Sequence, residues 1–160
     1  MRTARSRTSV GYLPCRVMTP PSQELESPEY PGRFTEGIET NSIESLSSLH
    51  AVEHFGLGRY GDRVDPTAAR RAMTSLARVR RPGGILLFSV PIGRERVVFN
   101  AHRIFAPESV PLAMSSLQLV SFSAVDDSGR LVVDCTPRDF GDADYACGLY
   151  AFTKPPSASL

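Results

Sequence analysis

Two histidines and a glutamate occur close together in the order His50-x-x-Glu53-His54. Imidazole side chains accept and donate protons near neutral pH, and they can orient a substrate hydroxyl or act as a general base. The three residues therefore form a candidate catalytic cluster. Each also has a structural alternative, because a histidine or glutamate beside a glycine-rich turn can cap or hydrogen-bond that turn.

The same residues match the His-x-x-Glu-His pattern of inverted zinc peptidases. In that chemistry one helix presents both imidazoles to a single zinc ion, and the glutamate polarises a bound water molecule. Gly56 and Gly58 leave little room for such a helix after the motif. Because so short a pattern also occurs often by chance, a zinc hydrolase is the third alternative, and no metal ligands are assigned.

A glycine-rich segment follows the histidines and is a candidate substrate-binding loop. Three glycines within six positions permit a tight path that exposes backbone N–H groups, and an arginine adds a bidentate donor. Such a loop suits an anionic or hydroxyl-rich ligand, although a loop also needs glycine merely to turn. The candidate substrate-binding residues are Gly56, Gly58, Arg59, Tyr60 and Asp62.

A third candidate cluster lies downstream, where an amide, an imidazole and a guanidinium occur within four positions. Asn100, His102 and Arg103 offer hydrogen-bond donors and a second candidate base. We predict that this cluster folds back over the end of the preceding strand and lies close to the first one. The structural alternative is that Arg103 pairs with Glu53 or Asp62 and so holds a loop.

The elements that must position these clusters are expected within residues 41–154. A short apolar stretch over 43–49 favours a strand, and His50 would then lie at its carboxyl end. Asp65-Pro66 is typical of a helix start, because aspartate accepts hydrogen bonds from the first turn and proline fits its first position. An apolar stripe at helical spacing continues to Val79.

Strands are expected after this helix. Pro82-Gly83-Gly84 should end the helix, and the apolar run Ile85–Val90 predicts a strand that is buried on both faces. A short helix is expected near Pro107. Further strands are expected over 117–125, 131–135 and 145–153. This order predicts an α/β fold with a mostly parallel sheet and an antiparallel edge.

The ends of the chain differ from this central region. Residues 1–40 contain many prolines and arginines and show no sustained period, so they predict a disordered or irregular leader, or a wrongly assigned start codon. Arginine and serine without early acidic residues also occur in transit peptides, whereas a secretory signal needs an apolar core that this segment lacks. Residues 155–160 are expected to form a tail.

The overall composition is that of an ordinary soluble domain, with 160 residues and a net charge of +1. No apolar run reaches the ~18 residues of a membrane-spanning helix, and no long polybasic arm occurs, so neither a membrane nor a nucleic acid is an expected partner. Cys15, Cys135 and Cys147 are widely spaced. They fit neither a disulfide framework nor a zinc ribbon and indicate a reducing compartment, which we expect to be the cytoplasm.

Several strings carry a resemblance to a known family. SSLHAVEHFGLGRYGD over 47–62 and FNAHRIF over 99–105 are long and specific, with RVRRPGG and VPIG between them and a weaker echo over 145–149. Across residues 41–105 they resemble the signature of the domain of unknown function 268 family. That family resembles the second half of class I S-adenosylmethionine-dependent methyltransferases, where a strand, a His-x-x-Glu-His-like turn, a helix and a Pro-Gly-Gly turn follow one another.

The resemblance implies a partial Rossmann-like methyltransferase sheet whose first half is missing. Such enzymes hold S-adenosylmethionine with a Gly-x-Gly-x-Gly loop, and residues 1–40 contain no such loop. The implied activity is methyl transfer to a small, sugar-like acceptor, with the two clusters at His50/Glu53/His54 and Asn100/His102/Arg103 as catalytic residues. The alternative is a non-catalytic domain that is degenerate, or that a partner chain or a second copy in a homo-oligomer completes.

Overall fold

The computed structural model of the chain describes residues 35, 37–58, 63–99 and 101–156. In order, its elements are β1 (Ile43–Leu49), the 3-10 helix η2 (Val52–His54), α1 (Ala68–Val79), β2 (Arg80–Ile92), β3 (Arg96–Val97), β4 (Arg103–Ile104), α2 (Ser109–Ala113), β5 (Gln118–Val125), β6 (Leu131–Val132), the 3-10 helix η3 (Pro137–Phe140) and β7 (Ala146–Thr153). Neither described α-helix has the length and apolar character needed to cross a membrane. Nearly all of the expected leader lies outside the described residues, as do the candidate site residues Arg59, Tyr60, Asp62 and Asn100.

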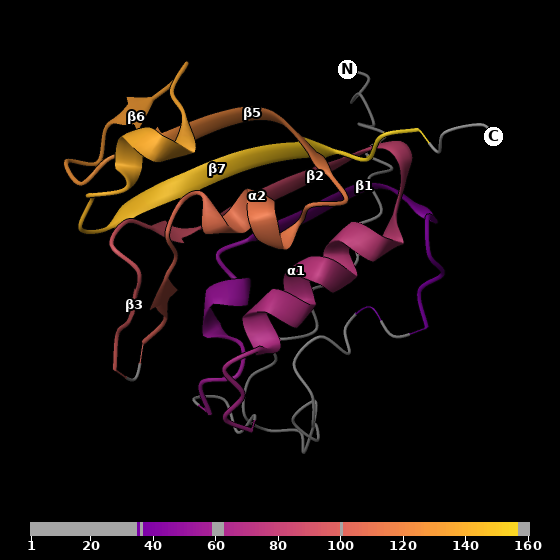
Figure 1. Cartoon of the computed structure of the whole chain (residues 1–160), viewed down its shortest axis with the longest axis horizontal. Helices are drawn as coiled ribbons and strands as arrows, with labels where there is room; N and C mark the ends of the chain where they lie inside the picture. The colour runs from indigo at the N-terminus through magenta and orange to yellow at the C-terminus, as the bar shows by residue number, and fades with distance from the viewer. Residues whose placement is uncertain (1–34, 36, 59–62, 100, 157–160) are drawn as a thin grey trace, which may run out of the picture.

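The main sheet has the strand order β1-β2-β7-β5-β6 (Figure 1). β1 and β2 are parallel, whereas β7 runs antiparallel to both β2 and β5, so that β1, β2 and β5 share one direction. β6 pairs antiparallel with β5 at the edge and is shorter than the strand expected over 131–135. The predicted α/β class with a partial Rossmann-like sheet is confirmed. Two strands, β6 and β7, run opposite to the other three. β6 lies at the edge, where an antiparallel strand was expected, whereas β7 lies inside the sheet.

α1 packs on one face of this sheet through an apolar stripe. Its buried residues recur at helical spacing, and most of them belong to one cluster with buried side chains of β2 and β7 such as Phe88 and Phe152. Val110 of α2 joins the same cluster. Each large apolar side chain that is fully buried in this way contributes roughly 1.5–3 kcal/mol. The helices therefore fix the position of the sheet from one side.

Asp65 caps the turn that leads into α1. Its Oδ1 atom accepts hydrogen bonds from the backbone N–H of Thr67 at 2.8 Å and from the Thr67 hydroxyl at 2.7 Å. The aspartate thus has the acceptor role predicted from Asp65-Pro66. The helix itself begins two residues later than Pro66, at Ala68.

β2 begins where α1 ends, earlier than the sequence predicts. The helix stops at Val79 and Arg80 already has an extended backbone. Pro82-Gly83-Gly84 therefore lies inside β2 rather than in a turn between helix and strand. The register with β1 is interrupted here, and Gly83, with a φ of +73°, lies in the resulting bulge.

The prediction that Ile85–Val90 is buried on both faces is wrong. Leu86 and Phe88 are fully buried, whereas Ile85 and Leu87 are 48% and 47% exposed. Successive side chains of a strand point to opposite faces, and the described helices cover only the face that carries Leu86 and Phe88. The opposite face of β2 is therefore open at Ile85 and Leu87, whereas Ser89 further along the same face is only 3% exposed.

Candidate functional site

The carboxyl ends of β1 and β2 lie side by side, and the first candidate cluster follows them. Leu49 at the end of β1 pairs with Ser89 of β2, and the backbone N–H of His50 donates to the carbonyl oxygen of Ser89 at 3.0 Å. Ligands of open α/β sheets bind at this end of parallel strands. His50 therefore lies where a ligand of such a sheet would be contacted.

His50 turns the chain sharply out of β1. Its φ of +48° lies in the left-handed region, which residues other than glycine rarely adopt. Holding a residue in so sparsely populated a conformation costs roughly 1–3 kcal/mol. The turn leads directly into η2, and His50 Nδ1 lies 3.2 Å from Oε1 of Glu53.

Glu53 is the buried centre of the cluster, with only 1% of its surface exposed. Its Oε1 atom lies 3.2 Å from His50 Nδ1 and 3.8 Å from His54 Nε2. Its Oε2 atom is buried and has no hydrogen-bond partner among the described residues. Burial, partly opposed by a backbone hydrogen bond, raises the pKa of the Glu53 carboxyl to about 7. The group therefore gains and loses its proton near neutral pH.

His54 connects this cluster to the downstream one. Its Nδ1 atom lies 3.0 Å from the carbonyl oxygen of Ala101, to which it donates when it carries the proton. The ring of His102 lies edge-on to that of His54, with 6.1 Å between the centroids, and 5.3 Å from the ring of Tyr145. The two clusters are therefore close in space, as the sequence analysis predicts, while Asn100 lies outside the described residues.

Arg103 holds the loop that follows η2. Its guanidinium donates to the carbonyl oxygen of Phe55 and, at 3.5 Å, to that of Asp65. The predicted partners of Arg103 were Glu53 and Asp62; the carboxyl of Glu53 is instead contacted by the two imidazoles, and Asp62 lies outside the described residues. Arg103 thus acts on backbone carbonyls on both sides of the glycine-rich segment.

Cys147 is a site residue that the sequence analysis does not identify. It lies on β7 opposite Pro91 of β2, and its Sγ atom is 3.0 Å from His50 Nε2. A second acceptor, the carbonyl oxygen of Gly148, lies 4.0 Å from the sulfur. The echo of the family signature over 145–149 is the signal in the sequence that marks this segment.

The side chains form one continuous chain of polar contacts. It runs from the Cys147 thiol through the imidazole of His50, the carboxyl of Glu53 and the imidazole of His54 to the carbonyl of Ala101. Burial and the nearby His54 lower the pKa of His50, whereas burial and the charge of Glu53 raise the pKa of the Cys147 thiol. At neutral pH the imidazole of His50 is therefore uncharged and able to accept a proton.

Gly56 allows the loop to pack tightly against the start of α1. It has a φ of +72°, and a Cβ atom at this position would lie 2.1 Å from the carbonyl oxygen of Asp65 and 2.7 Å from Cβ of Ala68. Gly58 also has a positive φ, of +71°. The structural reason for glycine is thus established at Gly56, and binding of a substrate by this loop stays a prediction.

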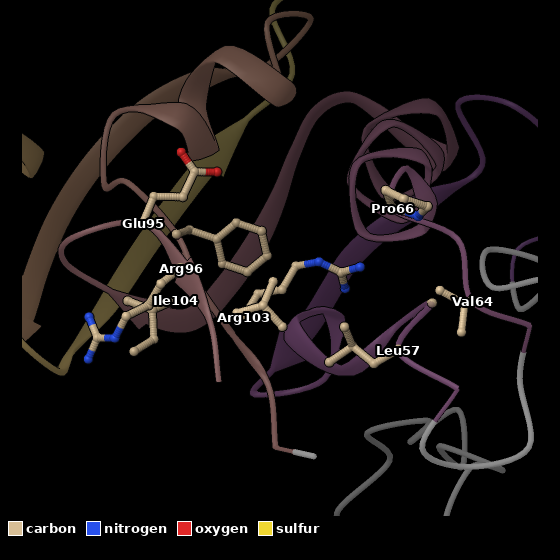
Figure 2. Close-up of a pocket in the computed structure, with 10 residues that line it drawn as sticks. Leu57, Val64, Pro66, Glu95, Arg96, Arg103 and Ile104 are labelled. Atoms are coloured by element: carbon tan, nitrogen blue, oxygen red, sulfur yellow. The ribbon is translucent and has the colours of Figure 1, made fainter. Parts of the chain in front are cut away.

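A pocket of about 410 Å³ is lined by segments that follow His54 and His102 in the sequence, among others, while the imidazole and carboxyl side chains of the cluster are not part of its lining. Figure 2 shows Arg103 extending toward the loop that carries Leu57 and Val64, whereas the guanidinium of Arg96 points away from it. The volume is that of a small-molecule site. Its walls are mostly apolar, and three of the lining residues, Glu95, Arg96 and Arg103, are charged.

The zinc hydrolase interpretation has no support in the structure. η2 comprises only Val52–His54 and is a 3-10 helix, while His50 precedes it at the end of β1. The two imidazoles therefore do not share one face of an α-helix, as the zinc pattern requires. Within the described residues, no three His, Cys, Asp or Glu side chains are arranged to hold a metal ion.

S-adenosylmethionine, the cofactor implied by the resemblance, does not fit the described residues alone. β1 ends in His50 and the Glu53 cluster, and β2 ends in Pro91-Ile92-Gly93. Neither strand of this parallel pair leads into a Gly-x-Gly-x-Gly turn, which would let the backbone approach the cofactor. The polar side chains at this end are imidazoles and a carboxyl, which can accept a proton from a hydroxyl group.

A family model described as "Caenorhabditis protein of unknown function, DUF268" matches residues 33–136. This match covers all the candidate catalytic and substrate-binding residues predicted from the sequence. It ends before Cys147 on β7. No curated protein matches the sequence.

Several solved structures are similar to the chain. They include the [4+2]-cyclase SpnF, with a TM-score of 0.50 and 14% identity over 74% of this chain and 53% of that chain. A second is the Burkholderia thailandensis 1,6-didemethyltoxoflavin-N1-methyltransferase with bound 1,6-didemethyltoxoflavin and S-adenosylhomocysteine, with a TM-score of 0.47 and 15% identity over 73% and 46% of the two chains. The present chain spans about half the length of these structures. At such identities the similarity is one of fold.

Proposed function

The chain belongs to the family described as Caenorhabditis protein of unknown function, DUF268, and we propose that its site binds a small acceptor and takes a proton from it for methyl transfer. The observation that carries the proposal is the buried carboxyl of Glu53 between two imidazoles at the carboxyl ends of β1 and β2. A carboxyl–imidazole pair removes protons from hydroxyl groups near neutral pH.

His50 is the base in this proposal. Its side chain is 45% exposed, against 2% for Glu53 behind it, so an acceptor in solution reaches the imidazole first. The lowered pKa of His50, caused mainly by burial, keeps the imidazole uncharged at neutral pH. When the acceptor hydroxyl donates to Nε2, the Cys147 thiol turns to its second acceptor, the carbonyl of Gly148. Glu53 stabilises the imidazolium that forms.

In this proposal the acceptor occupies the pocket and reaches past its rim to His50, which is not part of the lining. Apolar walls that include Leu57 and Ile104 suit the carbon skeleton of a small molecule, and Arg103 supplies donors at one side. His54 of η2 contacts Ala101 and His102 on the loop that precedes β4, and these contacts position the cluster. Gly56 and Gly58, with Arg59, Tyr60 and Asp62, remain the proposed binding loop, and Asn100 remains a proposed catalytic residue.

S-adenosylmethionine would supply the methyl group as a sulfonium. Because neither β1 nor β2 leads into a Gly-x-Gly-x-Gly turn and residues 1–40 contain no such string, we assign its binding to a site that a second copy of the chain completes. In this proposal the residues described in the structure have two roles, which are to bind the acceptor and to take its proton.

Calorimetric titration of the full chain with S-adenosylmethionine tests the proposal first. We expect saturable binding in the micromolar range, followed by transfer of a labelled methyl group to at least one member of a panel of sugars and other small hydroxyl compounds. The absence of saturable heat up to millimolar concentrations would contradict the methyltransferase proposal.

A matched pair of variants then tests the role of His50. His50→Gln removes the base but keeps a polar side chain, so the transfer rate should fall by about 100-fold or more while the affinity for S-adenosylmethionine is unchanged. Cys135→Ser, outside the cluster, should leave both quantities unchanged. Equal rates for the two variants would rule out His50 as the base.

A domain completed by a second chain is the alternative function, and the open sheet face favours it. Ile85, Leu87 and Leu49 are all about half exposed or more, and apolar sheet faces of this kind are usually covered in α/β proteins. Sedimentation equilibrium of the full chain distinguishes the cases. A homo-oligomer favours completion by a second copy, and a monomer that binds no S-adenosylmethionine favours a degenerate domain.

A further inference from the structure

We propose that Cys147, His50 and Glu53 form a thiol nucleophile site that reacts with small, uncharged carbon electrophiles carrying a leaving group. The site needs neither a methyl donor nor an acceptor hydroxyl. It therefore goes beyond the proposed function and stands or falls independently of it.

The three side chains have the order and spacing of a nucleophile, a base and a group that orients the base. Cys147 Sγ lies 3.0 Å from His50 Nε2, and His50 Nδ1 lies 3.2 Å from Glu53 Oε1. Both contacts are satisfied together when Nδ1 carries the proton and donates to the carboxylate, because Nε2 is then free to accept the thiol proton. This is the arrangement by which a histidine activates a cysteine or serine in other enzymes.

Glu53 supplies an observation that a structural role does not explain. Its side chain is 2% exposed, and its Oε2 atom has no partner among the described residues. A carboxyl that only held η2 in place would be expected to have both oxygens hydrogen-bonded, because an unsatisfied buried polar atom destabilises the fold. A carboxylate that serves as the counter-charge when His50 takes up a proton is, by contrast, useful in this position.

The protonation states determine how the thiol reacts. Burial and the charge of Glu53 raise the pKa of Cys147, so the sulfur carries its proton at rest. The pKa of His50 is lowered, mainly by burial, so the imidazole is an uncharged acceptor. Proton transfer to His50 therefore accompanies the attack of the sulfur, as in general-base catalysis, instead of preceding it.

The surroundings of the sulfur decide which electrophiles reach it. Leu49, Ser89 and Leu149 form one row across β1, β2 and β7 on the sheet face that carries Cys147. Leu49 is 60% exposed at the end of this row. None of these side chains is charged, so the face accommodates an uncharged group with apolar substituents.

The reaction step balances without any further reagent. Sγ of Cys147 forms a bond to the electrophilic carbon, and the bond from that carbon to the leaving group breaks. The leaving group departs with the electron pair of that bond, and the thiol proton passes to Nε2 of His50. The product is an S-substituted cysteine, with Glu53 as the counter-charge of the imidazolium.

Iodoacetamide is the probe for this site, with Cys135 as the internal control. Both thiols are partly buried and burial raises the pKa of both. Cys135 donates to the carbonyl oxygen of Val132, however, and not to an imidazole. In the full chain at pH 7.5 or so, peptide-resolved mass spectrometry should show Cys147 alkylated at least about tenfold faster than Cys135. An equal or slower rate at Cys147 would overturn the proposal.

Two variants test whether the alkylation rate of Cys147 depends on His50 and Glu53. His50→Gln should slow alkylation of Cys147 by about tenfold or more and leave the rate at Cys135 unchanged. Glu53→Gln, which keeps an acceptor at Oε1 but carries no charge to balance the imidazolium, should slow the alkylation of Cys147 by a smaller factor. An unchanged rate at Cys147 in His50→Gln overturns the proposal. If His50→Gln instead raises the alkylation rate at both cysteines, this variant has unfolded. The rates at Cys147 in the wild type and in Glu53→Gln then test the proposal, and equal rates overturn it.

Discussion

The Nε2 atom of His50 lies 3.0 Å from the Sγ atom of Cys147, although 97 positions separate the two residues in the sequence. β2 sets this distance, because it pairs with β1 on one side and with β7 on the other. Ser89 lies opposite Leu49, and Pro91 lies opposite Cys147. A shift of either strand by one residue would move its side chains to the other face of the sheet and separate the pair.

The first prediction concerns Glu53 and the dependence of stability on pH. The pKa of this carboxyl rises from 4.5 to about 7 on folding, so between these values the folded protein binds a proton that the unfolded chain releases. The free energy of unfolding therefore falls as the pH rises from about 4.5 to 7, by at most about 3 kcal/mol from this group. Glu53→Gln should flatten this fall and be the more stable protein at pH 8.

Urea denaturation at pH 5, 6, 7 and 8 measures this effect, with Glu39→Gln as the exposed control. The groups that face Glu53 are His50, His54 and Cys147. The lowered pKa of His50 acts in the opposite direction, because an imidazole that is uncharged when folded makes stability rise with pH. The difference between the wild type and Glu53→Gln isolates the carboxyl, and an identical slope in both would contradict the prediction.

The second prediction separates two reasons for glycine at a positive φ. Gly56 and Gly129 have φ of +72° and +82°, but only at Gly56 would a Cβ atom collide with neighbours, at 2.1 Å from the carbonyl oxygen of Asp65. Gly129→Ala should cost about 1–2 kcal/mol from the left-handed backbone alone. Gly56→Ala should cost more, because the loop must also move away from α1. Equal losses in thermal unfolding would show that the contact with Asp65 does not constrain the loop.

Much of the sheet could be predicted from local patterns in the sequence. The strands expected over 43–49, 117–125 and 145–153 each match an observed strand to within two residues at either end, because turn residues bound them on both sides. The exposed face of β2 could not be predicted in the same way. An unbroken apolar run has no period, and its burial depends on whether other segments supply a second layer of helices.

The candidate site could be predicted in part for the same reason. His50, Glu53 and His54 are adjacent in sequence, so a strand end is enough to place them together. Cys147 joins them only because β7 inserts between β2 and β5, and no local pattern encodes that insertion. In the sequence, the cysteine by itself indicates only the redox compartment, and the echo of the family signature over 145–149 marks its segment without placing it beside His50.

The third prediction concerns Arg103 as the residue that holds the glycine-rich segment. Its guanidinium donates to the carbonyl oxygens of Phe55 and Asp65, a fork that one lysine ammonium cannot reproduce. Arg103→Lys should lower the free energy of unfolding by about 1.5–3 kcal/mol, the range for hydrogen bonds to charged groups. Arg130→Lys is the control, since Arg130 is 80% exposed and pairs only with Asp126 among the ion pairs of the described residues. A loss equal to that of the control would contradict the role of Arg103.

The last prediction tests whether the face of β2 that carries Leu87 is open in the isolated chain. Leu86 and Leu87 are neighbours with the same side chain, but Leu86 is fully buried and Leu87 is 47% exposed. Leu86→Ala should cost about 2–5 kcal/mol, because it leaves a cavity between the sheet and α1. Leu87→Ala removes side-chain atoms that already contact water in part, so its cost should stay below about 1.5 kcal/mol. Urea denaturation at low protein concentration keeps the chain from covering this face by self-association. A loss at Leu87 as large as that at Leu86 would show that another segment of the same chain covers the face.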